Sequence, residues 1–152
     1  YGKTDNAIFY YAVAYGISSV AAFAIAITVA KNVGSEKIEA FNGLGKSKPF
    51  LAAALTISIL SMAGIPPFAG FFGKYYIFSE AIKTGHLWLT IVAVLNSIVG
   101  VYYYFKVILA MYTKDSSESV ISVSLAYSIV IILCTVLTIL IGIYPSGLAN
   151  LL

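Results

Sequence analysis

Long runs of apolar residues alternate with short polar segments along this chain. Three runs stand out: 7–30 and 122–144 contain no charged residue, and 87–113 contains one. About 20 apolar residues in a helix are enough to cross the hydrocarbon core of a bilayer. Each of these runs therefore predicts a membrane-spanning helix.

A fourth apolar region, 49–85, is interrupted. It has 37 residues, whereas two full crossings would need about 40. Its middle part, 63–73, holds two prolines and three glycines. Proline lacks a backbone N–H and pushes the preceding residue away from helical geometry. We therefore predict one discontinuous span over 50–84, with helical halves at about 50–62 and 73–84 and a break near 63–73.

The break should lie deep in the membrane. A first half of thirteen residues makes a helix about 20 Å long, and the hydrocarbon core is about 30 Å thick. Non-helical backbone at that depth is tolerated only where it is buried in protein or lines a water-filled cavity. The residues expected to form the broken backbone are Gly64, Pro66, Pro67, Gly70 and Gly73.

The polar segments give an orientation. Segment 31–48 predicts either a short helix on the membrane surface or a plain loop, 114–119 a polar turn, and 148–152 a tail without a further element. Four crossings place five lysines on one side against two on the other, which favours the first side as cytoplasmic. The two groups are Lys31, Lys37, Lys46, Lys48 and Lys114 against Lys3 and Lys83.

Composition supports an all-α membrane protein with about four transmembrane helices in a single domain, 1–152. The 152 residues are 61 % hydrophobic and 10 % charged, whereas soluble domains are about 25 % charged. The net charge of +3 comes with lysines in loops or at breaks, so it does not indicate a nucleic-acid partner. With one cysteine and one histidine, we expect no disulfide, metal site or bound cofactor in this chain. A chain that starts at Tyr1 without a leader pattern is expected to be a piece of a longer protein.

Lys74 is the main candidate for a functional side chain. It lies about ten residues from the end of its segment at Thr84, roughly 15 Å by helical rise, which is farther than a lysine stem can reach. An ionisable residue inside a membrane indicates function by default. Since burial disfavours the charged form of lysine, Lys74 could take up and release a proton when a neighbouring charge changes. Asn96 and Ser97, polar residues at mid-depth of the next span, are expected to face protein.

The other titratable residues have two readings each. Lys106 either extends to the lipid headgroups or serves as a relay between Lys74 and a water path. Glu80 and Lys83 are three residues apart near a helix end and are expected to pair at the membrane interface. His86 is expected at the same interface, although a proton exit also fits its titration range.

The run from Leu60 to Phe78, which contains the break and Lys74, resembles the broken-helix signature of the antiporter-like subunits of respiratory complex I. The segments 102–108 and 41–45 are similar to neighbouring parts of the same family. The resemblance is strongest to the subunit N family of bacterial proton-translocating NADH–quinone oxidoreductases, the counterpart of mitochondrial subunit 2. It implies a fold of fourteen helices with inverted repeats, of which this chain would be the C-terminal part.

The resemblance also implies a function. Lys74 would carry protons at the broken helix, and Lys106 stands where the family has a basic residue. Quinone, NADH, FMN and Fe–S clusters would belong to partner subunits. The partners would be other membrane subunits of complex I and the lipid bilayer, in a multi-pass protein of the bacterial inner (plasma) membrane. Two alternatives stay open: a subunit of an Mrp-type cation/proton antiporter, and a structural scaffold for helix packing.

Overall fold

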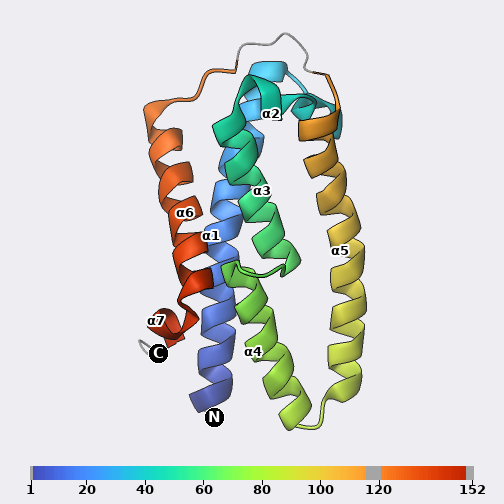
Figure 1. Ribbon diagram of the computed structural model, residues 1–152. Helices are drawn as coiled ribbons and strands as arrows, with labels where there is room; N and C mark the ends of the chain where they lie inside the picture. Colours follow the sequence, from blue (N-terminus) through green and yellow to red (C-terminus); the bar gives the residue numbers. More distant parts are fainter. Residues whose placement is uncertain (1, 116–120, 150–152) are drawn as a thin grey trace.

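The computed structural model describes residues 2–115 and 121–149, and within these ranges its regular structure is entirely helical. The predicted all-α class is thereby confirmed. Figure 1 shows the long helices standing side by side in one bundle. The elements are α1 (Gly2–Val33), the 3₁₀-helix η1 (Ile38–Phe41), α2 (Leu44–Ser47), α3 (Pro49–Ala63), α4 (Ala69–Lys83), α5 (Leu87–Thr113), α6 (Leu125–Ile143) and α7 (Pro145–Ala149).

Within these described ranges three helices, α1, α5 and α6, are long and apolar enough to cross a membrane. α1 extends beyond the expected span 7–30 at both ends and stops at Gly34, whose φ of 74° ends the helix. α6 is shorter than the expected span 122–144. It begins after Ser124, whose hydroxyl accepts a hydrogen bond from the backbone N–H of Tyr127, as a capping residue does.

The second span is broken, as predicted, but the break is shorter than predicted. α3 and α4 follow one another end to end, joined by residues 64–68 (Figure 1). The expected break, 63–73, is wrong at its far end because α4 already begins at Ala69. The prolines at 66 and 67 account for the non-helical segment, and no later residue before Lys83 lacks the backbone N–H that a helix needs.

Gly70 and Gly73 lie inside α4 and are needed for close packing. A Cβ atom on Gly70 would collide with the carbonyl oxygen of Ser61 at the end of α3. A Cβ atom on Gly73 would lie 3.2 Å from the Cα atom of Tyr11 in α1. Small residues at such positions let membrane helices approach each other closely, so these glycines bring α4 against its neighbours.

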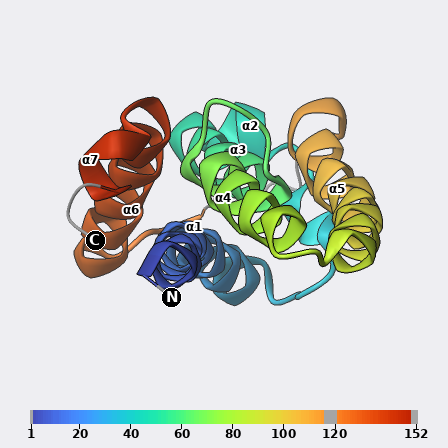
Figure 2. The same ribbon diagram turned by 90° about the horizontal axis from the view of Figure 1, so that it is seen from below.

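Figure 2 shows α1, α3 and α4 in the middle of the bundle, with α6 and α7 on one side and α5 on the other. The larger hydrophobic core joins α1, α3, α5 and α6 through buried side chains such as Ile25, Leu55, Met111 and Ile131. The middle of α5 contributes little to this core, and most of its apolar side chains are exposed.

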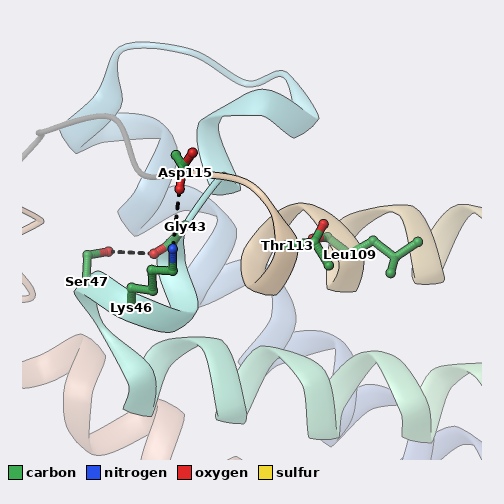
Figure 3. Close-up of polar contacts among 6 residues, drawn as sticks. All are labelled: Gly43, Lys46, Ser47, Leu109, Thr113 and Asp115. Carbon is green, nitrogen blue, oxygen red and sulfur yellow. Dashed lines mark hydrogen bonds and ion pairs between the residues drawn. The ribbon is translucent and has the colours of Figure 1, made fainter.

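The connector between α1 and α3, left open as helix or loop by the sequence, contains η1 and α2. It is held against the end of α5, where the N–H of Gly43 donates to the carbonyl oxygen of Ala110 (3.1 Å). Figure 3 shows the neighbouring ion pair between Lys46 and Asp115 (3.3 Å). Both of its side chains are exposed, so it contributes little to stability.

Two expectations for the connecting segments have different outcomes. Residues 116–119 of the expected polar turn lie outside the described residues, and so do 150–152 of the expected tail. The tail was wrongly expected to hold no further element, because α7 runs from Pro145 to Ala149. Proline is well suited to the first position of a helix, where its missing N–H costs no hydrogen bond.

α6 packs directly on the break. A Cβ atom on Gly142 would collide with the carbonyl oxygen of Pro67 and lie 2.7 Å from the nitrogen of Ala69. The helix therefore needs a residue without a side chain at this point.

Gly142→Ala is expected to lower the free energy of unfolding by about 1–3 kcal/mol, because backbone cannot easily move away from the added methyl group. Gly16→Ala in α1 is the matched control, since nothing lies within 4 Å of its Cβ position. Thermal unfolding of the full-length subunit in detergent compares the two. Equal stability of both variants would contradict the close contact between α6 and the break.

Candidate functional site

The side chain of Lys74 joins the two halves of the broken helix. It starts in the second turn of α4 and reaches back to the end of α3, where its Nζ donates to the carbonyl oxygen of Ala63 (3.1 Å). Nζ also donates to the hydroxyl of Ser97 in α5 (3.3 Å). Lys74 is partly buried, so its ammonium group is bound by protein atoms from two other helices.

The end of α3 suits a cation. The last four carbonyl groups of a helix have no partner in the helix and carry partial negative charge. Gly64 closes α3 in the left-handed conformation, with its N–H bonded to the carbonyl oxygens of Leu60 and Ser61. The carbonyl of Ala63 lies beyond these bonds and accepts from Lys74 instead.

Gly64 meets two requirements at once. Its φ of 82° is rarely adopted by residues with a side chain. In addition, a Cβ atom here would lie 2.8 Å from Cδ of Lys74. The lysine chain therefore passes directly over this glycine on its way to Ala63.

The start of α4 is fixed by a group of buried hydroxyls. The N–H of Gly70 donates to Oγ of Ser61 (3.0 Å). Oγ of Ser61 also accepts from Ser18 of α1 (2.9 Å), and Ser18 lies 3.4 Å from the hydroxyl of Thr138 in α6. The first N–H groups of a helix need such partners inside a membrane, where no water is at hand. This network therefore holds α4, and with it Lys74, at a set depth.

Two cavities border Lys74. One, of about 500 Å³, lies between the break, α4 and α5 and has mainly apolar walls. The other, of about 360 Å³, lies between α1, α4 and α5 and includes Tyr11, Asn96 and Ser97. Lys74 and Ser97 border both cavities, Ser79 adds a further polar side chain to the first, and Tyr11 and Asn96 add two to the second. Both cavities therefore offer the two to four polar partners that an ordered water needs, and the second has the smaller apolar wall.

Lys106 lies far from this site. It is exposed on α5, with Nζ 4.5 Å from the ring centre of Tyr102 and 5.8 Å from that of Tyr103. It follows Ser97 by nine residues, which is about 14 Å along the helix and half a turn around it. The structure does not bring Lys106 and Lys74 together, and the relay role of Lys106 stays a prediction.

The remaining candidates lie at the far end of α4. Nζ of Lys83 is 2.8 Å from the carboxylate of Glu80, so these residues do pair. Nδ1 of His86 lies 3.1 Å from the hydroxyl of Thr84. In the part of the chain that the structure describes, no three His, Cys, Asp or Glu residues are grouped closely enough to hold a metal ion.

Sequence reasoning missed the partners of Lys74. Ser97 was expected to face protein, but nothing in its spacing indicated that it faces Lys74. The role of Ser61 was indicated only weakly, by a hydroxyl near the end of the expected first half-helix. Both partners depend on how the helices are rotated against each other, which a uniformly apolar helix does not encode.

Comparison with known proteins gives consistent matches. Residues 2–100 match the family described as NADH:quinone oxidoreductase/Mrp antiporter, transmembrane. The chain is 43 % identical over 152 residues to NADH-quinone oxidoreductase subunit N of Flavobacterium psychrophilum, a match that covers 98 % of this chain and 33 % of the relative. It thus spans about a third of the length of the curated relatives it matches.

Two solved structures are similar to this fold. Respiratory complex I from Thermus thermophilus contains a chain that is 26 % identical, with a TM-score of 0.80 over 98 % of this chain and 36 % of that one. The Mrp complex from Dietzia sp. DQ12-45-1b contains one that is 21 % identical, with a TM-score of 0.85 over 96 % of this chain and 36 % of that one. At 21 % identity the second likeness shows the fold alone.

Gly64→Ala is expected to destabilise the protein more than Gly85→Ala. Both glycines have positive φ, 82° and 84°, so both substitutions carry the backbone cost of about 1–2 kcal/mol. Only at Gly64 would the methyl group meet another side chain, that of Lys74. Thermal unfolding in detergent measures the difference.

A double variant separates the two costs at Gly64. Adding Lys74→Ala removes the atoms that the methyl group meets, so the penalty of Gly64→Ala should fall to that of Gly85→Ala, after allowance for the loss of Lys74 itself. If the penalty of Gly64→Ala were the same with and without the lysine side chain, the two residues would not be in contact.

Proposed function

The chain belongs to the NADH:quinone oxidoreductase/Mrp antiporter family of membrane proteins, and we propose that it is part of a proton-translocating subunit of an NADH–quinone oxidoreductase. The resemblance predicted from residues 60–78 is confirmed by these matches. The observation that carries the proposal is the position of Lys74, which bonds the carbonyl oxygen at the end of one half-helix from within the other. Lys74 is proposed as the group that takes up and releases the proton.

Opposing effects act on the charge of Lys74. Removal from water disfavours the ammonium form, whereas the carbonyl of Ala63 at the negative end of α3 favours it. A change in a neighbouring charge shifts the balance between these effects. This is how the site can couple proton binding to events elsewhere in a larger assembly.

Ser97 can support both states of the lysine. Its hydroxyl donates to the carbonyl oxygen of Ala93 (2.9 Å) while its oxygen accepts from Lys74. A serine hydroxyl rotates to suit its partners. After the ammonium group loses a proton, this hydroxyl can turn and donate to the free electron pair of the amine, so that neither form is left without a partner.

The chemistry of electron transfer belongs to other subunits in this proposal. Quinone, NADH, FMN and Fe–S clusters would bind to partner chains, and this chain would contribute a proton path without a redox centre. The helices α1, α5 and α6 mark it as an integral membrane protein. Other membrane subunits of the complex are its proposed neighbours, in the inner (plasma) membrane of a bacterium.

A subunit of an Mrp-type antiporter is the second candidate, because the fold is shared with the Mrp complex from Dietzia sp.. The first candidate is favoured by the 43 % identity to a curated subunit N. Sodium-dependent proton exchange without quinone reduction in the purified assembly would favour the second.

Lys74→Met in the whole complex is expected to lower proton pumping coupled to quinone reduction at least about tenfold, because methionine has similar length but cannot carry a proton. Lys37→Met is the control, since Lys37 is exposed in the connector beside η1. Pumping is measured in proteoliposomes after assembly has been checked by native gel electrophoresis. Normal pumping by assembled Lys74→Met would favour the structural-scaffold reading instead.

A further inference from the structure

A third cavity lies at the far end of α4, away from the break. It has a volume of about 250 Å³ and is bordered by α4, the first residues of α1 and the start of α5. Its polar residues are Glu80, Thr84 and His86. These three residues have no part in the proton transfer proposed above for Lys74.

This cavity continues the polar cavity beside Lys74. Ile77 lines both, and so stands between them on α4. The two other walls also continue by one helical turn, since Ala7 and Leu89 border the outer cavity where Tyr11 and Ala93 border the inner one. Residues four apart lie on the same helix face. The two cavities therefore follow one groove between α1, α4 and α5.

The groove runs along successive turns of α4. Lys74, Ile77 and Glu80 follow at intervals of three residues, so their backbone positions span about 9 Å along the axis of α4. The side chain of Lys74 reaches back toward Ala63 and away from Glu80, so a chain of several water molecules is needed to join its Nζ to the carboxylate of Glu80. Ile77 offers no hydrogen bond, and it borders both cavities.

The groups at the outer end can accept a proton. The side chain of Glu80 is 18 % exposed, and its carboxylate lies 2.8 Å from Nζ of Lys83. Nδ1 of His86 is 3.1 Å from the hydroxyl of Thr84. They lie at the end of the bundle where α4 turns into α5, opposite to the connector that holds η1 and α2 (Figure 1).

We propose that Glu80 and His86 form the outlet of the proton path and that Ile77 is the apolar barrier between this outlet and Lys74. The inference rests on the proposed function. An N–H bond of Lys74 breaks and a proton passes through water to the carboxylate of Glu80 or the imidazole of His86. No electrons are exchanged. Movement of the Ile77 side chain opens the connection, and its return prevents back-flow.

The barrier is tested by Ile77→Ser in the whole complex, reconstituted in proteoliposomes. A serine at this position can hold water, so passive proton leak through the idle complex should rise several-fold. Leu95→Ser on the exposed face of α5 is the control, because Leu95 borders none of these cavities. The leak should disappear when Lys74→Met is combined with Ile77→Ser.

The outlet is tested by Glu80→Gln together with His86→Gln. The double variant should lose most of its proton pumping, whereas Glu36→Gln, a matched change at an exposed position in the connector, should keep it. When Glu80→Asp replaces Glu80→Gln in the double variant, part of the proton pumping should return. A purely structural role of the side chain would not explain this recovery.

Two results separate this inference from the proposed function. Suppose that the Ile77→Ser complex leaked no more protons than the unmodified complex and that the Glu80 and His86 double variant pumped normally. The proposed outlet would then be wrong, while loss of pumping in Lys74→Met would still support the role of the lysine. If Lys74→Met pumped normally, the proposed function itself would fail.

Discussion

A helix that stops inside a membrane must find partners for its own free N–H and C=O groups, and the structure around the break follows from this need. In water these groups would be solvated, but in hydrocarbon each unsatisfied group costs several kcal/mol. At the end of α3 the partner of Ala63 is the ammonium group of Lys74. At the start of α4 the partner of Gly70 is the hydroxyl of Ser61. The proposed proton carrier is thus also one of the groups that make the break possible.

The other contacts around the break bring neighbouring helices close to the partners of Ala63 and Gly70. α6 needs Gly142 to lie against the carbonyl of Pro67, and α4 needs Gly73 to lie against Tyr11 of α1. Ser18 and Thr138 extend the hydroxyl network to the same two helices. On the other side, α5 contributes Ser97 to the lysine and polar groups to one cavity. Lys74 therefore lies between the closely packed helices α1, α3 and α6 on one side and the more loosely packed α5 on the other.

The sequence was sufficient to predict the approximate spans and the break and to single out Lys74 as a candidate, because each depends on local chemistry. Two successive prolines in the interior of an apolar run, as at 66 and 67, interrupt a helix, and a lysine in such a run stands out without knowledge of its neighbours. The length of the break was wrong because Gly70 and Gly73 were interpreted as helix breakers. Their role is set by Ser61 and Tyr11, which lie far off along the chain or on another element. Ser97 could not be assigned as a partner of Lys74 for the same reason.

The most direct test of the central claim is a cryo-EM map of the whole complex in lipid nanodiscs, at a resolution that shows ordered water. The map should show the backbone interrupted at residues 64–68, Nζ of Lys74 in hydrogen-bond contact with the carbonyl of Ala63, and water in the cavity beside Asn96. A continuous helix from α3 into α4, or a lysine side chain extended to the lipid headgroups, would contradict the account.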